Sequence, residues 1–383
     1  MEMVNEDVLR KTKQWRGYVQ AKLGFRNHWY PIFFSSEVNE GKPVSTKLLG
    51  ENILINRIDG DVFVIKDRCL HRGVPLSQKL ECYTKDTITC WYHAWTYQWK
   101  DGLLCDILTD PGSRRVGKLK LKTYTAQEAK GLIFVFMGDI DPPPLSHDVP
   151  PNFLDDNMAI HGIKTKVNSN WRMGAENGFD STHVFIHKDS QMMPENETVV
   201  PLGFSPNRGE ENKMVTLVKG DEGPTGVFDN LGAHSRPIFE GTIQGEPVVH
   251  SVMGGDKRIA LQISIWLPGA LKVDPFPDPS LIQFEWYVPR DETSHWYFRT
   301  LGRRVENPVE EAAYEKEFHE HWKPLSLHGF NDDDIWAREA MQTFYEDDWG
   351  WVNEQLFEAD RNIIAWRKLA SEMNRGIQSP SDL

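Results

Sequence analysis

Cysteine is scarce in this sequence, and long hydrophobic runs are missing from it. The four cysteines, Cys69, Cys82, Cys90 and Cys105, are too few among 383 residues for the disulfide framework of a secreted protein. No run of about 18 apolar residues occurs, which excludes a transmembrane helix. Residues 1–14 are charged and lack the apolar core of a secretory signal, so a cytoplasmic location is expected.

Positive charge is also in deficit. The chain has 43 Lys and Arg against 56 Asp and Glu, which gives a formal net charge of −13 at pH 7. This balance argues against a nucleic-acid partner, because proteins that bind nucleic acid rely on a positive field. Hydrophobic residues make up 39% of the chain and aromatic residues 11%, which is enough to build folded cores.

The order of the segments predicts an α+β protein of two domains. Apolar residues at helical spacing predict a helix within residues 1–29, and short β segments with turn signals such as Asp59-Gly60 follow. The prolines near residue 143 break regular structure, so we place domains at residues 30–150 and 151–383, with residues 1–29 packing on the second. For that second domain we predict a helix over 168–187, strands over 214–218, 248–253, 259–267, 281–288 and 295–301, and helices over 308–322, 334–344 and 352–373.

Two short loops each combine one cysteine with one histidine. Cys69-Leu-His71 and Cys90-Trp-Tyr-His93 form the pattern C-x-H-x18-C-x2-H. Zinc fingers usually group cysteine with cysteine and histidine with histidine, whereas a Rieske [2Fe–2S] centre places two thiolates on one iron and two imidazoles on the other. The pattern therefore favours a Rieske centre over a zinc site or over buried cysteines beside ordinary histidines. The other two cysteines have no histidine at matching spacing and are expected to be buried small residues.

A second group of candidate ligands lies in the second domain. Asp180, His183 and His187 follow Asn177 in the pattern N-x2-D-x2-H-x3-H. On the predicted helix the two histidines share one face, because they are four residues apart. Two histidines and one carboxylate form the facial triad of non-haem Fe(II) oxygenases. Histidines at this spacing are often merely solvated, but an electron carrier in the same chain favours a metal site that uses its electrons.

The missing carboxylate should come from far along the chain. The acidic run Asp332–Asp334 offers three candidates. These residues could instead cap a helix, since a first turn favours aspartate, and both roles can be shared among them.

The chain resembles the Rieske non-haem iron ring-hydroxylating oxygenases. Residues 68–77 match the first cluster loop of that family and residues 90–97 the second, with Trp91 and Ala94 where proline and glycine are commonest. The resemblance extends along the chain and is strongest to the subgroup that attacks carbazole-like aromatics. The further matching stretches are residues 23–31, 152–156, 264–268, 283–289, 334–341 and 350–353.

The resemblance implies an α+β fold with an N-terminal all-β Rieske domain. The catalytic domain would be an antiparallel sheet covered by helices, of the helix-grip type. It also implies one [2Fe–2S] cluster and one mononuclear Fe(II) per chain. The cluster ligands would be Cys69, His71, Cys90 and His93.

The resemblance also selects among the acidic residues. The family's ligand begins a helix in an Asp-x4-Glu-Ala pattern, which Asp334 fits and Asp332 and Asp333 do not. We therefore expect His183, His187 and Asp334 to hold the iron, with Asp333 as the alternative carboxylate.

The resemblance gives Asp180 a different role. It implies that this carboxylate bridges a cluster histidine of one subunit, expected to be His93, and an iron ligand of the next subunit. Such a bridge requires a ring of subunits, and head-to-tail contacts close into rings, so a homotrimer is implied.

The implied reaction is angular dioxygenation of carbazole or a related fused aromatic with O2, giving 2'-aminobiphenyl-2,3-diol from carbazole. The Gly178 carbonyl could accept the substrate N–H. Residues that match pocket positions are Gly178, Ile263, Phe276, Gln283 and Phe330, although the apolar ones could equally be ordinary core residues.

Electrons for this reaction would come from outside the chain. The sequence has no nucleotide-binding G-x-G-x-x-G after a strand, so we expect a ferredoxin that is reduced by an NAD(P)H-dependent reductase. A Rieske monooxygenase or oxidative demethylase would share every metal ligand and is the alternative enzyme. A Rieske ferredoxin fused to an inert binding domain is the alternative without catalysis.

Overall fold

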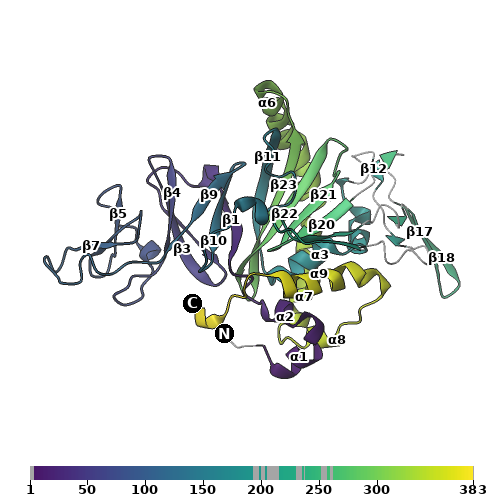
Figure 1. Cartoon of the computed structure of the whole chain (residues 1–383). Coiled ribbons are helices and arrows are strands. Elements are labelled where there is room, and N and C mark those ends of the chain that lie inside the picture. The colour runs from purple at the N-terminus through teal and green to yellow at the C-terminus, as the bar shows by residue number, and fades with distance from the viewer. Residues whose placement is uncertain are drawn as a thin grey trace. The chain divides into compact units, whose positions relative to one another are not determined.

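The computed structural model describes residues 4–192, 198–199, 203–204, 215–229, 235–236, 238–251, 257–258 and 262–382 (Figure 1). They divide into two compact units, residues 1–25 with 144–380 and residues 26–143 with 381–383. The strands predicted over 214–218, 248–253 and 259–267 lie partly outside the described residues. In the described ranges no helix is long and apolar enough to cross a membrane.

The unit formed mainly by residues 26–143 is built from antiparallel β-structure. Its described strands form three small sheets with the orders β1-β10-β9, β2-β3-β4-β8 and β5-β6-β7. The strands are β1 (His28–Phe34), β2 (Val44–Leu48), β3 (Glu51–Ile58), β4 (Asp61–Lys66), β5 (Thr87–Thr89), β6 (Trp95–Gln98), β7 (Leu104–Ile107), β8 (Thr123–Tyr124), β9 (Ala126–Ala129) and β10 (Leu132–Met137).

The turn signal at Asp59-Gly60 is confirmed as a hairpin. Strands β3 and β4 pair with Ile58 opposite Asp61, which leaves Asp59 and Gly60 as a two-residue loop. Their φ angles of 52° and 90° are those of the turn that matches the twist of the flanking strands. Glycine takes this conformation without strain.

The other unit is organised around a seven-stranded antiparallel sheet with the order β11-β23-β22-β21-β20-β15-β14. The two longest described strands of this sheet are neighbours and are mostly buried, so they form a rigid base for the residues on them. The strands are β11 (Met158–Val167), β14 (Val215–Val218), β15 (Gly226–Asp229), β20 (Gln262–Trp266), β21 (Ala270–Asp274), β22 (Leu281–Asp291) and β23 (Ser294–Arg304). Six further strands lie in partly described segments, and two of them, β17 (Ile238–Ile243) and β18 (Glu246–Ser251), form a hairpin. The other four are β12 (Thr198–Val199), β13 (Gly203–Phe204), β16 (Ser235–Arg236) and β19 (Lys257–Arg258).

Helices from distant parts of the chain pack on this sheet. Helix α3 contacts β20–β23, α9 contacts β14 and β15, and α7 contacts α3, so the sheet and its covering helices lie together in Figure 1. The helices are α1 (Glu6–Lys11), α2 (Arg16–Gln20), α3 (Trp171–Phe179), α6 (Pro308–Glu317), α7 (Asp332–Tyr345), α8 (Gly350–Asn353) and α9 (Arg361–Met373). The predicted antiparallel sheet covered by helices is thereby confirmed.

Several predicted helices have different limits. The helix predicted over 168–187 ends at Phe179, and a 3-10 helix, η5 (His183–Asp189), follows. Helix α6 continues as a π-helix, η7 (Phe318–His328), instead of ending near 322. Helix α7 begins at Asp332 rather than Asp334, and α9 begins at Arg361 rather than 352.

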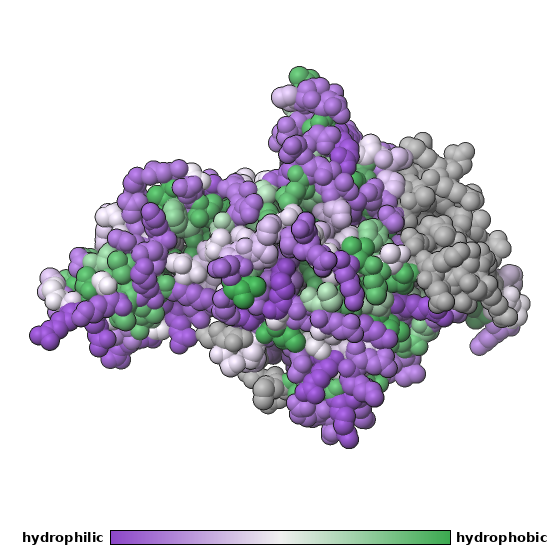
Figure 2. Space-filling view, viewed as in Figure 1, coloured by the Kyte–Doolittle hydropathy of each residue, from purple (hydrophilic) through white to green (hydrophobic). Residues whose placement is uncertain are grey.

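Helix α6 presents a largely polar surface. Nearly all its residues are exposed apart from Tyr314, which is buried. Figure 2 accordingly shows mostly hydrophilic colouring on this helix, at the top of the view. Surface helices commonly bury one stripe and leave the rest to solvent.

Candidate functional site

The two cysteine–histidine loops share one backbone pattern. In the first loop, Cys69 N–H donates to the Val74 carbonyl and the Cys69 carbonyl accepts from Gly73 N–H, both at 2.9 Å. In the second loop, Cys90 N–H donates to the Trp95 carbonyl at 2.7 Å, and the Cys90 carbonyl accepts from Ala94 N–H at 2.9 Å. Each loop therefore turns back immediately after its cysteine, so the histidine is carried on a tight turn.

These turns gather two thiols and two imidazoles. Cys69 and Cys90 are both 2% exposed, whereas His71 is exposed and His93 is half-buried, with their ring centroids 4.5 Å apart. Burial raises the pKa of the Cys90 thiol. Two buried thiols beside two more exposed imidazoles are the donor set that a Rieske cluster requires, so the residues present fit that group.

The departures from the commonest loop sequence have structural consequences. Trp91 donates through Nε1 to the Pro75 carbonyl at 2.9 Å and so ties the second loop to the first. Ala94 has a φ of 54°, a conformation that favours glycine.

Cys82 is exposed, so its predicted burial is wrong, while Cys105 is partly buried and donates to the Thr96 carbonyl at 3.4 Å. The sequence around Cys82 did not indicate that this cysteine lies in an exposed loop.

The second group of candidate ligands is assembled where α3 ends. Asp180 leaves the helix with φ −66° and ψ 123°, so the two histidines lie on a separate 3-10 helix and not on one helix that continues from residue 168. The Asp180 carboxylate accepts from Thr182 N–H at 2.7 Å and from the Thr182 hydroxyl at 2.9 Å. Its main-chain carbonyl, and not its carboxylate, accepts from Nδ1 of His183 at 2.6 Å.

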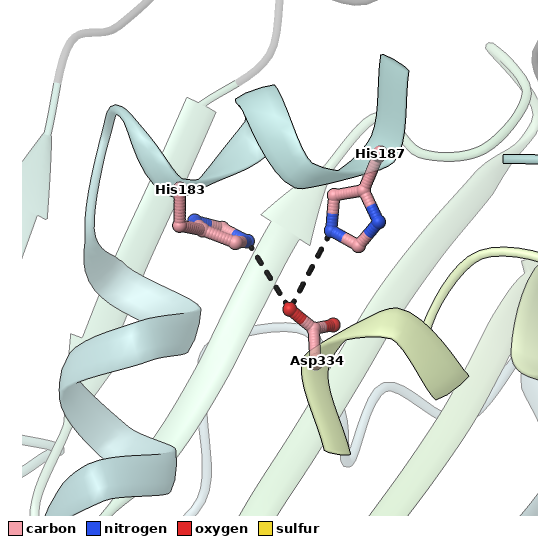
Figure 3. A group of neighbouring side chains, drawn as sticks. All are labelled: His183, His187 and Asp334. Carbon is pink, nitrogen blue, oxygen red and sulfur yellow. Dashed lines mark ion pairs between the residues drawn. The ribbon is translucent and has the colours of Figure 1, made fainter. Parts of the chain in front are cut away.

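The described residues contain one group that could hold a metal ion, namely His183, His187 and Asp334. Nε2 of His183 and Nε2 of His187 each lie 3.5 Å from Oδ1 of Asp334. Figure 3 shows both rings directed at this carboxylate, with the histidines on η5 and the aspartate on the first turn of α7. Segments about 150 residues apart in sequence therefore converge on one point.

The chemistry of these atoms fits a metal ion. Nε2 of His187 and Oδ1 of Asp334 are buried and have no hydrogen-bond partner within the described part of the chain. The opposite nitrogen of each ring is occupied, since Nδ1 of His183 donates to a carbonyl and Nδ1 of His187 lies 3.4 Å from Oδ2 of Asp333. This arrangement leaves both Nε2 lone pairs free for a metal.

The electrostatics keep Asp334 ionised. Its burial opposes ionisation, but His187 and the Arg338 guanidinium outweigh this effect and hold the pKa of Asp334 well below its usual range. Burial lowers the pKa of His187, but the effect of Asp334 and Asp333 in the opposite direction is larger, so the net shift of this pKa is upward. A buried anion between two imidazoles is well suited to bind a cation.

The neighbouring acidic residues have separate partners. Asp332 pairs with Arg299 at 2.6 Å, and Asp333 contacts the far side of the His187 ring. The N-cap position of α7 is Asn331, which makes no side-chain capping bond. Neither aspartate is therefore the helix cap that was predicted.

A cavity opens beside this cluster, and all five predicted pocket residues line it. Ile263, Phe276 and Phe330 supply apolar walls, and Gly178 and Gln283 also contribute. Phe330 stacks on the His187 ring with the centroids 3.7 Å apart. Because His183 and Asp334 line the same cavity, a molecule bound in it would lie next to the candidate metal site.

Sequence reasoning missed five further lining residues, Val184, Leu271, Val273, Glu285 and Asn331. One signal was available for Glu285, because a charged residue in the middle of a strongly apolar strand is rare unless it is paired. Gln283, Glu285 and Tyr287 alternate along β22 and so lie on one face of the sheet.

Two family patterns match this chain. Residues 28–124 match the Rieske [2Fe-2S] domain, and residues 136–378 match the homotrimeric ring hydroxylases. The second pattern covers more than half of the chain and includes the three candidate ligands.

Individual relatives match over nearly the whole length. The terminal oxygenase component of carbazole 1,9a-dioxygenase from Metapseudomonas resinovorans is 60% identical over 381 residues, which are 99% of this chain and 98% of the relative. A solved reduced complex between oxygenase and ferredoxin in carbazole 1,9a-dioxygenase has a TM-score of 0.96 and 58% identity, covering 100% of this chain and 98% of the other. The terminal oxygenase from Novosphingobium sp. KA1 has a TM-score of 0.94 and 56% identity, with 98% and 100% covered.

Proposed function

The chain belongs to the homotrimeric ring hydroxylases with a Rieske [2Fe-2S] domain, and we propose that it is the terminal oxygenase of a carbazole-type angular dioxygenase. It is an oxidoreductase that uses a Rieske cluster and a mononuclear non-haem iron. The proposed reaction adds both atoms of O2 to a ring carbon bonded to nitrogen and to its neighbour, and the product from carbazole opens to 2'-aminobiphenyl-2,3-diol. The observation that carries this proposal is the apolar cavity beside His183, His187 and Asp334 in a chain so similar to such oxygenases.

The proposed ligands form two groups, one for the cluster and one for the mononuclear iron. Cys69, Cys90, His71 and His93 would hold the cluster, and His183, His187 and Asp334 would hold the iron. Bound there, the iron would supply O2 activation with electrons delivered through the cluster. Asp333 and the Asp180 carbonyl keep the two imidazoles oriented through their Nδ1 atoms.

The cavity would bind a flat aromatic molecule. Ile263, Phe276 and Phe330 supply apolar contact and exclude water, which limits unproductive use of reducing equivalents. The Gly178 carbonyl is our proposed acceptor for the substrate N–H. This pairing would orient the ring carbon next to nitrogen toward the metal site.

Electron transfer would pass between subunits of the trimer. We infer that the Asp180 carboxylate accepts a hydrogen bond from a cluster histidine, His93, of the neighbouring subunit. Its own main-chain carbonyl already holds His183, so a single residue would connect the two centres.

A ferredoxin is the electron donor in this proposal. A groove beside the exposed His71 is lined by basic side chains, which suits an acidic partner. The residues with positive charge there are Lys66, Arg68, Arg72, Lys120 and Lys122. Because a reductase would reduce the ferredoxin again with NAD(P)H, we propose that the enzyme works in the cytoplasm.

One reconstitution tests this function. The purified chain is combined with a ferredoxin and its reductase, supplied with NADH, carbazole and isotopically labelled O2, and the products are identified by mass spectrometry. We expect 2'-aminobiphenyl-2,3-diol with both oxygen atoms labelled. Incorporation of one atom would instead support a monooxygenase, and loss of the methyl group from an aromatic methyl ether supplied in place of carbazole would support a demethylase.

A further inference from the structure

A buried carboxylate lies at the polar end of the cavity. Glu285 is 2% exposed and accepts from the hydroxyl of Tyr287 at 2.5 Å, from the hydroxyl of Tyr297 at 2.7 Å, and from Nε2 of Gln283. Burial holds the pKa of both tyrosines well above its usual range, so both hydroxyls keep their protons and donate. The Arg338 guanidinium, 4.0 Å from the Tyr297 ring centroid, supplies positive charge to this buried cluster.

The two carboxylates of the site fix the direction of the hydrogen bonds between them. Asp334 can only accept, so Asn331 presents Nδ2 to it, at 3.4 Å. The Oδ1 of Asn331 then accepts from Nε2 of Gln283 at 3.3 Å, and the same amide nitrogen donates to Glu285. Both neighbours of Gln283 therefore require its nitrogen, which settles the orientation of this amide.

In this orientation the amide oxygen of Gln283 is a hydrogen-bond acceptor without a donor in the described part of the chain. Oε1 of Gln283 is buried and has no hydrogen-bond partner among the described residues, and Gln283 lines the cavity. A buried polar atom without a partner is unfavourable, because it has lost its contacts with water and gained none in return. A ligand that brings an N–H or O–H group would remove that penalty.

Glu285 also acts on Gly178 through Tyr287. The Tyr287 hydroxyl that donates to Glu285 lies against the Cα of Gly178, where an added Cβ would be only 1.8 Å from it. The position of the Gly178 carbonyl is thus linked to the same carboxylate. Both polar groups that a substrate could meet at this end are hydrogen-bond acceptors.

We propose that Glu285 is a positioning residue that fixes the Gln283 amide with its carbonyl toward the substrate, so that the cavity selects fused aromatics carrying an N–H or O–H donor. This inference rests on the proposed function for the class of ligand, an aromatic ring system, but it concerns binding and not oxygenation. Glu285 itself acts through Gln283 and Tyr287 and need not touch the substrate.

The test compares two ligands of similar shape, carbazole with its N–H and fluorene with a CH2 in the same place. Dissociation constants are measured by calorimetry on the oxidised holoenzyme without reductant. One hydrogen bond of about 1–1.5 kcal/mol predicts that the wild-type chain prefers carbazole by roughly tenfold. In Glu285→Gln the new amide can donate to Oε1 of Gln283 and turn it around, so carbazole binding should weaken roughly tenfold while fluorene binding stays within twofold.

A double-mutant comparison separates positioning from general damage. Gln283→Leu alone should lower the preference to what the Gly178 carbonyl supplies by itself, and Glu285→Gln should then change the ratio of the two constants by less than twofold in that background. Tyr297→Phe removes one donor to Glu285 but not the Gln283 contact, so it should leave the ratio unchanged.

The inference is overturned if the wild-type chain shows no preference or binds neither ligand, if Glu285→Gln weakens both ligands equally, or if Glu285→Gln keeps the full preference of the wild-type chain. Failure of the proposed function would look different, because carbazole would then bind with this preference yet yield no diol in the reconstituted system.

Discussion

The hydroxyl oxygen of Tyr287 occupies the space where a side chain on Gly178 would begin. An ideal Cβ at position 178 would lie 1.8 Å from that oxygen, and the hydroxyl cannot simply retreat, because it donates to the buried Glu285. Gly178 is therefore required by packing as well as by the cavity that it lines.

Gly178→Ala should accordingly destabilise the protein and distort the cavity. Overpacking of this kind typically lowers the free energy of unfolding by about 1–3 kcal/mol, measurable by chemical denaturation. Adding Tyr287→Phe should restore part of the loss, since it removes the closest atom. Gly223→Ala is the matched control, because a Cβ there meets nothing within 4 Å, and it should change stability by less than about 0.5 kcal/mol. An equal effect of the two glycine substitutions would contradict this account.

Asp334→Ala should remove the mononuclear iron and leave the cluster in place. The iron content should fall from about three to about two atoms per chain, with the Rieske electron paramagnetic signal of the reduced protein retained. Asp333→Ala is the control, because Asp333 contacts Nδ1 of His187 on the side away from Asp334. If Asp333→Ala loses iron and Asp334→Ala does not, the assignment of the ligand must be reversed.

The candidate metal ligands were predicted more accurately from the sequence than the helices and turns on which they lie. The spacing of Cys69, His71, Cys90 and His93 is local, and so are the turns that position them, which is why the cluster loops could be read directly. The choice of Asp334 over Asp333 depended on family resemblance. The contacts that separate the two residues come from helix α7 meeting η5, and no local pattern contains that information.

The predicted helix over 168–187 shows where local reasoning failed. The mixture of polar and aromatic residues continues past Phe179, but the Asp180 carboxylate accepts from the N–H and hydroxyl of Thr182 where the helix ends. Such side-chain bonds to nearby backbone compete with helical hydrogen bonds. Glu285 was missed for a related reason, because its partners Tyr287 and Tyr297 meet it only when β22 and β23 pair.

Tyr97→Phe should lower the reduction potential of the cluster. The Tyr97 hydroxyl lies 3.3 Å from Sγ of Cys69, and burial holds the pKa of Tyr97 well above its usual range, so it donates to a cluster thiolate. Hydrogen bonds to sulfur favour the reduced state. A bond of about 1–1.5 kcal/mol corresponds to a drop of roughly 40–60 mV, at about 59 mV per factor of ten. A redox titration monitored by circular dichroism would measure the reduction potential. Cys105→Ser, the control, should leave the potential unchanged. A potential that is unaltered in Tyr97→Phe would rule out this role.

Asp180→Asn should slow turnover strongly without loss of either metal centre. The main-chain carbonyl that holds His183 is retained in this variant, so the iron site should keep its geometry, whereas the charge of the proposed bridge is lost. We expect product formation to fall at least about tenfold, while iron content and the cluster signal remain normal. Asp189→Asn, an exposed carboxylate on the 3-10 helix that carries His183, should be fully active. Normal activity of Asp180→Asn would exclude the bridging role.

Asp229 should make the stability of the protein depend on pH. This carboxyl is buried on β15; burial and the neighbouring Asp180 raise its pKa to about 7, although Nδ2 of Asn362 donates to it at 3.0 Å. In the unfolded chain an aspartate has a pKa of about 3.9. The folded state therefore binds the proton more tightly, so the stabilising contribution is complete below about pH 4 and is lost as the pH rises to about 7.

Asp229→Asn should remove this part of the pH dependence, because the amide stays neutral and its oxygen can still accept from Asn362. Since each pKa unit corresponds to roughly 1.4 kcal/mol, the variant should gain up to a few kcal/mol relative to the wild-type chain at pH 8, and much less at pH 5. Urea unfolding at both pH values measures the difference, with Asp221→Asn, an exposed carboxylate, as the control that should show no such trend. A wild-type and an Asp229→Asn protein whose stabilities run parallel from pH 5 to pH 8 would show that Asp229 is already ionised in the folded state. In that case the Asn362 bond, and not a bound proton, stabilises the buried carboxyl.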